Sequence, residues 1–235
     1  MVSRGDTDTS AAEDTSTFQL RLDDLKRRGS SLLVVGSVPN ELYSRASRQM
    51  LGAPTEPRRR LTVMNESASL DSRLHPSIRR SPEWTRVIRY QTLERSAAAA
   101  SAGGTPIQSA YERRVNGGLG RLGSEISKDI ENFDSLANGM SPAELRVAFD
   151  ALPSLLANYE RKEVFRFLHA MTAHVRAQKG MVHVWSPGER TDEVNRMLAP
   201  LFDAVVELDV DGQNARQRWH LRDIDVSSGW FPLED

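Results

Sequence analysis

The residues whose types and spacing suggest chemistry lie in the stretch from Ser30 to Arg48, SSLLVVGSVPNELYSRASR. A short apolar run ends on Gly36, and a segment with helical periodicity follows it. That order is typical of a strand, a phosphate-binding loop and a helix in an α/β nucleotide-binding fold. Gly36, Ser37 and Asn40 are therefore the candidate phosphate-loop residues. Such a loop holds phosphate through backbone N–H groups, a lysine, and a Ser or Thr that binds Mg²⁺.

The groups that perform this chemistry are missing from the loop. When the pattern G-x-x-x-x-G-K-[ST] starts at Gly36, the residues Glu41, Leu42 and Tyr43 take the places of Gly, Lys and Ser/Thr. A carboxylate at such a place repels phosphate, and Pro39 has no N–H to donate. We therefore predict that this is a vestigial phosphate loop, that the protein uses no cofactor, and that it is not an active ATPase.

Asp150 is the candidate metal residue. It ends an apolar stretch, as does the Walker B aspartate that holds Mg²⁺ through water in nucleotide-hydrolysing proteins. Without a Lys or a Ser/Thr partner, however, a metal at Asp150 has no nucleotide to bridge. An Asp at the end of a strand also commonly caps the turn or helix that follows, and this interpretation is favoured.

Three glycines, Gly118, Gly120 and Gly123, spell the G-x-G-x-x-G fingerprint of dinucleotide-binding folds. The fingerprint requires a preceding strand and the first strand-to-helix turn of the fold. The preceding YERRVN has the composition of a poor strand, and the first such turn is at Gly36. We expect these glycines to open a tightly packed helix rather than to bind a dinucleotide.

Other polar residues have ordinary structural interpretations. His183 alternates with Val182 and Val184, which predicts a histidine in the core or on a sheet surface. The arginine runs at 58–60 and 79–80 are able to contact nucleic-acid phosphates, but no aromatic residues are interleaved with them, and solvated loop charge is the favoured interpretation.

Composition limits the class of protein. The chain has 235 residues, 39% of them hydrophobic, which is enough to bury the core of a single α/β domain. It has no Cys, so a thiolate metal site is excluded, and its net charge of −1 gives no general attraction to nucleic acid or anionic membranes. No apolar run approaches the ~18 residues of a membrane helix, and the first residues lack the apolar region of a signal peptide. We expect a cytoplasmic protein that does not contact membranes.

Periodicity along the chain predicts the fold. The expected strands are 32–36, 60–65, 84–91, the stretch that ends at Asp150, 181–185, 204–208 and 217–224, and the main expected helices are 40–51, 119–136, 161–178 and 192–198. Strands that alternate with helices, followed by a terminal hairpin, predict a mainly parallel sheet flanked by helices with a C-terminal antiparallel hairpin.

The remaining stretches are expected to be irregular, apart from a short helix just before the first strand. Residues 1–17 should form a disordered tail, with a single domain over 18–235. Residues 66–82 read as a long surface loop, and the small-residue stretch 96–104 as a loop or helix start beside the active edge of the sheet. Asn40 is placed to cap the helix that follows Gly36.

The order of four stretches resembles a known family. SSLLVVGSVPNELYSRASRQMLG, RRRLTVMNES, ELRVAFDALPSLLANYERKEVFRFLHAMTAHVR and FDAVVELDVDGQNARQRWHL are similar to a haloarchaeal family of KaiC-like, RecA-type proteins with a degenerate P-loop, sometimes called HTR-like (halobacterial transducer-like). The resemblance covers about residues 18–233 and is most specific in VFRFLH and FDAVVEL. It implies a RecA-like core with Gly36 at the former phosphate loop and Asp150 in the Walker B position, and its function is unassigned. In active relatives the C-terminal hairpin packs at a subunit boundary. Only four lysines against many arginines fit a salt-adapted host, whereas the near-neutral charge departs from one.

Three functions remain open on this evidence. The favoured one is a non-catalytic RecA/KaiC-like domain that acts as a regulatory or signalling-associated interaction module, through self-association or a protein partner. The second is a nucleotide-binding protein or ATPase without a standard Walker A motif. The third is a DNA-associated transcriptional regulator, although the chain has no evident helix-turn-helix or basic stripe.

Overall fold

A computed structural model describes residues 18–92, 109–224 and 226–234 of the chain. The expected disordered tail and the small-residue stretch 96–104 both lie outside these ranges. A helix over residues 18–28 leads into the first strand.

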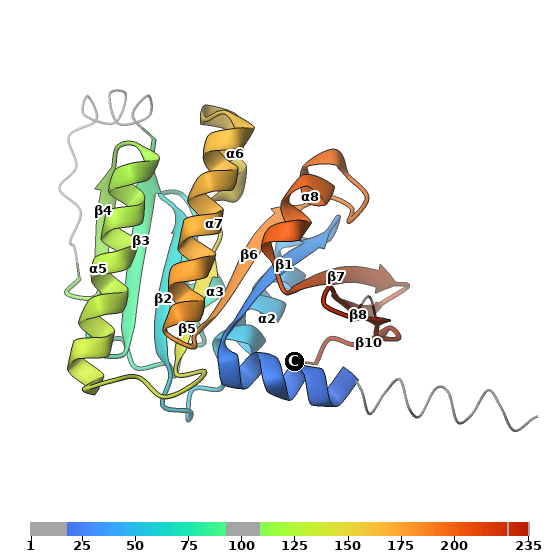
Figure 1. Ribbon diagram of the computed structural model, residues 1–235, viewed down its shortest axis with the longest axis horizontal. Helices are drawn as coiled ribbons and strands as arrows, with labels where there is room; N and C mark the ends of the chain where they lie inside the picture. Colours follow the sequence, from blue (N-terminus) through green and yellow to red (C-terminus); the bar gives the residue numbers. More distant parts are fainter. Residues whose placement is uncertain (1–17, 93–108, 225, 235) are drawn as a thin grey trace, which may run out of the picture.

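Within the described residues, one ten-stranded sheet runs in the order β10-β8-β7-β1-β6-β5-β2-β3-β4, with β9 paired to β8 (Figure 1). From β7 to β4 every neighbouring pair is parallel, and β8, β9 and β10 add an antiparallel edge. The strands are β1 Ser30–Gly36, β2 Arg59–Asn65, β3 Thr85–Gln91, β4 Glu112–Asn116, β5 Leu145–Phe149, β6 Met181–Pro187, β7 Ala204–Asp211, β8 Asn214–Leu221, β9 Val226–Ser227 and β10 Phe231–Pro232. The predicted fold class, a mainly parallel sheet with a C-terminal antiparallel hairpin, is confirmed.

Helices cover both faces of this sheet (Figure 1). The helices are α2 Asn40–Leu51, α3 Leu70–Arg73, α5 Leu119–Ala137, α6 Leu152–Asn158, α7 Arg161–Ala177, α8 Glu193–Leu198 and a 3-10 turn at Ala199–Leu201. One core packs α5, α6, α7 and α8 against one face, and two smaller cores pack helix 18–28, α2 and α3 against the other. None of the helices in the described ranges is both long and apolar enough to cross a bilayer.

The central strand β1 is buried along its whole length, because β6 and β7 flank it in parallel and helices cover both of its faces. Its side chains from Leu32 to Val35 are at most 1% exposed. Burial of each such apolar side chain is worth about 1.5–3 kcal/mol, so this run fixes the middle of the sheet. The carboxyl end of β1 therefore holds Gly36 and the start of the following loop in a fixed position.

Three local predictions were wrong. Residues 66–82 are not a loop throughout, because Leu70, Leu74 and Ile78 are buried in a core of their own and α3 forms within the segment. The stretch YERRVN contains β4, an edge strand that is polar because only its Val115 is buried. Pro39, rather than Asn40, is the N-cap residue of α2, and Asn40 is the first helical residue.

Candidate functional site

Two backbone N–H groups that flank the loop after β1 are hydrogen-bonded within the protein. The Gly36 N–H donates to the Gly188 carbonyl oxygen at 2.8 Å, and the Leu42 N–H donates to the Pro39 carbonyl oxygen at 3.0 Å as α2 begins. Gly36 has φ +146°, and a Cβ there would lie 2.4 Å from the Leu208 carbonyl oxygen. Glycine at 36 is therefore required by close packing of the loop against β7.

An arginine from α3 occupies the space between this loop and Asp150. The Arg73 Nε and Nη2 atoms lie 2.7 and 2.6 Å from Asp150 Oδ2, and Nη2 also donates to Asn40 Oδ1 at 2.8 Å. The Arg73 Nη1 atom donates to the Ser44 hydroxyl. One guanidinium thus joins α2, α3 and the end of β5.

Both members of the ion pair are buried, the Arg73 side chain 6% exposed and the Asp150 side chain 7%. Burial raises the pKa of the Asp150 carboxyl, and the charge and hydrogen bonds of Arg73 oppose that rise. Removing either partner of such a buried pair is strongly destabilising, because the remaining charge is then desolvated without compensation.

An aromatic stack lies beside the guanidinium. The rings of Tyr43 and Trp185 are 4.2 Å apart between centroids and inclined by 18°, and the Arg73 guanidinium lies 4.7 Å from the Tyr43 ring centroid. Tyr43 is fully buried, and that burial raises its pKa well above the ordinary value. Side chains of α2, α3 and β6 therefore pack closely where the strand ends meet α2.

His183 lies in the same layer, on the side chain row of β6 that faces α2. Its Nε2 atom is 2.8 Å from the Ser47 hydroxyl, and its Nδ1 atom has no partner among the described residues. Burial lowers the pKa of His183 to about 3, and the positive charges of Arg146 and Arg73 act in the same direction. The imidazole is neutral at physiological pH, in agreement with a core histidine.

The structure thus brings Asn40 and Asp150 together, through Arg73, and places Gly36 at the end of β1, two strands from β5, with Ser37 exposed beside it. Arg73 was missed by the sequence interpretation. At Asp150 the guanidinium supplies the positive charge that a metal ion would otherwise supply. In the described part of the chain, no three His, Asp or Glu side chains gather into a group able to hold a metal ion.

The arginine run at 58–60 is mostly buried, contrary to the prediction of solvated charge. Arg60 is 2% exposed and donates to the carbonyl oxygens of Leu51, Gly52 and Ala53, so it caps the C-terminal end of α2. Arg59 pairs with Glu144 at 2.9 Å. Because these groups stabilise the fold from inside, they do not form a basic surface patch.

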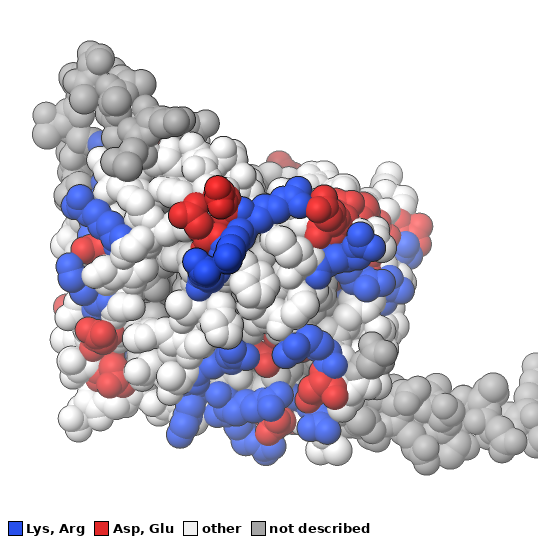
Figure 2. Space-filling view, turned by 45° about the horizontal axis from the view of Figure 1, so that its top comes forward, with Lys and Arg blue, Asp and Glu red and all other residues white. Residues whose placement is uncertain are grey.

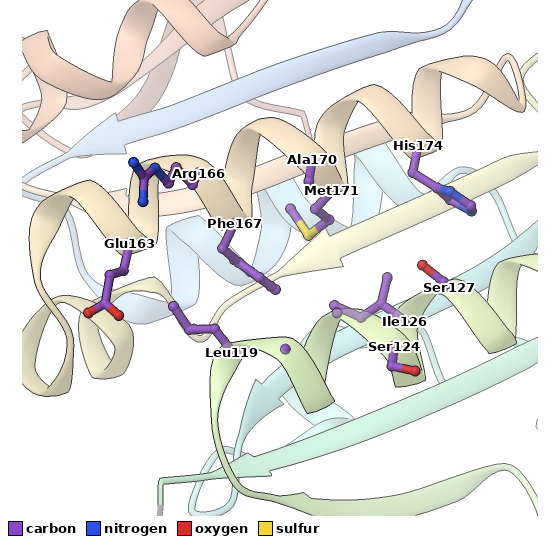
Figure 3. A pocket seen from close by; sticks show the side chains of 12 residues that line it. Leu119, Ser124, Ile126, Ser127, Glu163, Arg166, Phe167, Ala170, Met171 and His174 are labelled. Carbon is purple, nitrogen blue, oxygen red and sulfur yellow. The ribbon is translucent and has the colours of Figure 1, made fainter.

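The three fingerprint glycines lie where β4 leads into α5, so a strand does precede them, at the edge of the sheet. Gly118 and Gly120 have room for a side chain, since a Cβ on either meets nothing within 4 Å, and a Cβ on Gly123 would lie 3.7 Å from the Phe167 ring. Figure 3 shows Phe167 of α7 pointing across a groove toward α5. This groove, of about 570 Å³, lies between the two helices, and Gly120 and Gly123 line its α5 side.

Comparisons with known proteins agree with this architecture. The sequence model of a protein family described as a family of unknown function (DUF7504) matches residues 29–208. Among solved structures, a KaiC-like protein from the hyperthermophilic archaeon Pyrococcus horikoshii OT3 is similar, with a TM-score of 0.50, 12% sequence identity, and coverage of 83% of this chain and 78% of that chain. At that identity the likeness shows the fold alone. No curated protein matches the sequence significantly.

Proposed function

The chain belongs to the family of unknown function DUF7504, and we propose that it serves there as a non-catalytic KaiC-like domain, a regulatory module that acts by contact with other protein. The structural likeness establishes its KaiC-like fold. This fold is the part of the sequence resemblance that is confirmed. The haloarchaeal, HTR-like assignment stays a prediction.

The observation that carries the proposal is the position of the Arg73 guanidinium. It bonds Asp150, Asn40 and Ser44 at the strand end where a KaiC-like ATPase would bind nucleotide and metal. A bound phosphate-metal group would have to displace a buried, multiply bonded cation, and the loop offers no lysine in exchange. The proposal requires that ATP, ADP and GTP with Mg²⁺ do not bind with sub-millimolar affinity.

Surface charge favours a protein partner over nucleic acid. Figure 2 shows Lys and Arg side chains interspersed with Asp and Glu on the face it presents, with no continuous positive stripe. Many arginines in the described part of the chain are paired with carboxylates, as are Arg216 with Asp209 and Arg218 with Glu207. DNA binding depends on unpaired positive charge that neutralises phosphates, so this pattern supports a regulator that contacts protein.

The contact surface is proposed from the exposed apolar side chains. Four large ones stand out among the described residues: Leu20, Leu136, Val210 and Phe231. Leu20 lies on helix 18–28, and Val210 and Phe231 lie on the C-terminal strands that pack beside that helix (Figure 1). Exposed apolar side chains on neighbouring elements mark an interaction surface, which we assign here to a second copy of the chain.

Light scattering tests this surface. We expect a mass twice the 26.3 kDa of one chain at both low and high salt, because contacts between apolar side chains are not screened by salt. A double variant, Leu20→Glu with Val210→Glu, should be monomeric, whereas Leu136→Glu, an exposed site on α5, should stay dimeric. A monomeric wild-type mass at both salt concentrations would rule out self-association.

A further inference from the structure

A cavity of about 490 Å³ lies at the amino-terminal ends of the parallel strands, whereas the candidate site lies at their carboxyl ends. Its walls come from helix 18–28, the end of α2 and the C-terminal strands, and its floor includes the first residues of β1 and β6, Ser30 and Met181. Ligand sites in proteins typically have volumes of about 300–1,000 Å³, so the cavity is large enough for a small molecule. The amino ends of parallel strands line it, whereas Gly36 and Asp150 lie at the carboxyl ends.

Arg146 of β5 faces this cavity and, among the described residues, has no anionic partner. The residue is 9% exposed, and its Nη1 atom donates to the Met181 sulfur at 2.9 Å. A thioether sulfur is a weak acceptor. In the described ranges the buried Nε atom has no hydrogen-bond partner, and no carboxylate lies within ion-pair distance of the guanidinium. A buried guanidinium normally has such a partner, because its desolvation is otherwise uncompensated.

The charges around Arg146 make the lack of an anionic partner more costly. Burial lowers the pKa of Arg146 to about 10, and the positive charges of Arg58 and Arg60 contribute. Glu56 is the acidic group that opposes them, yet its carboxylate already accepts from Arg58 at 3.1 Å and from the Ala53 N–H at 2.9 Å. The neighbourhood of Arg146 therefore has a local excess of positive charge.

The rest of the cavity is mainly apolar. Its wall includes the side chains of Leu25, Leu32, Met50, Trp219 and Phe231. A free anion such as phosphate would satisfy Arg146 and leave this surface unused, and an uncharged apolar molecule would leave the guanidinium unpaired. A carboxylate with an apolar body satisfies both, since the planar guanidinium fork matches a carboxylate.

We propose that this cavity binds a small organic acid, with its carboxylate on Arg146 and its apolar body against helix 18–28, Met50 and the C-terminal strands. This site is separate from the Arg73 cluster, although Phe231 belongs both to its wall and to the proposed self-association surface.

The methionines provide a direct test on the full chain. Met50 and Met181 line the cavity, Met171 lines the groove between α5 and α7, and Met140 and Met197 lie elsewhere. Protein labelled with ¹³C on the methionine methyl groups is titrated with decanoate below its micelle concentration. We expect saturable shifts at Met50 and Met181 alone. Absence of shifts, or shifts confined to Met171, would overturn the proposal.

Two comparisons test the role of Arg146. Acetate and 1-decanol, which carry the charge and the apolar chain separately, should both bind more weakly than decanoate. Arg146→Gln should lower the affinity for decanoate about ten- to hundredfold, because a charge-assisted hydrogen bond is lost. Arg222→Gln, at an exposed arginine outside the cavity, should leave that affinity unchanged. If Arg146→Gln does not fold, Arg146→Lys, which keeps the charge and loses the fork, should still bind decanoate more weakly than wild type. Equal affinity for decanoate and decanol, or equal affinity of wild type and the folded Arg146 variant, would contradict the proposal.

Discussion

Replacing Arg73 by methionine should reduce the free energy of unfolding by about 3–5 kcal/mol, the cost of leaving a buried charge without its partner. Arg73→Met keeps an apolar stem of similar length but removes the bonds to Asp150, Asn40 and Ser44. Asp150 is then a buried carboxylate without its guanidinium partner. Urea unfolding followed by circular dichroism at pH 7 measures the loss.

The double variant Arg73→Met with Asp150→Asn separates the pair from its surroundings. It should lose less stability than Arg73→Met alone, because no unpaired charge stays buried. Arg80→Met is the matched control, since Arg80 lies in the same segment and pairs with the exposed Asp71, a contact worth about 0–1 kcal/mol. If Arg73→Met lost no more free energy of unfolding than Arg80→Met, the Arg73 guanidinium would not stabilise the site.

The second large effect concerns pH and His183. Its pKa is about 3 in the folded protein against an ordinary 6.5, so on acidification the unfolded chain binds this proton first. Acid therefore favours the unfolded state. The resulting loss in the free energy of unfolding is absent above about pH 7 and grows as the pH falls toward 3. The slope from this one group approaches about 1.4 kcal/mol per pH unit between about pH 6 and 4.

Urea midpoints measured from pH 7 to pH 4 test this. His183→Gln, which keeps a side chain able to bond Ser47, should remove that part of the acid slope, while the exposed His75→Gln should retain it. An unchanged slope in His183→Gln would mean that His183 is not held neutral by the core.

The central strand and its helix were predictable because their signals are local. The apolar run from Leu32 to Val35, followed by Gly36, is typical of a buried strand, and the boundaries expected for α2, Asn40 and Leu51, are those observed. Asp150 was found for the same reason, since it directly follows the apolar strand β5. Its position beyond β6, one strand away from β1, required the topology.

Arg73 was missed because its role depends on contacts between distant segments. Nothing in the polar stretch 66–82 distinguishes one arginine from another, and the partner carboxylate is 77 residues away. A weak signal was present, since Leu70, Leu74 and Ile78 recur every four residues and are buried. The buried capping role of Arg60 was also not predicted, because the carbonyl oxygens it caps belong to the end of α2.

Equilibrium titration of the wild-type protein with ATP, ADP and GTP in the presence of Mg²⁺ tests the central claim most directly. The buried Arg73 cluster and the missing lysine predict no saturable binding of any of the three at sub-millimolar concentrations, which means a binding free energy weaker than about −4 kcal/mol. Saturable binding of any one of them with a sub-millimolar Kd would contradict the account and establish a working nucleotide site.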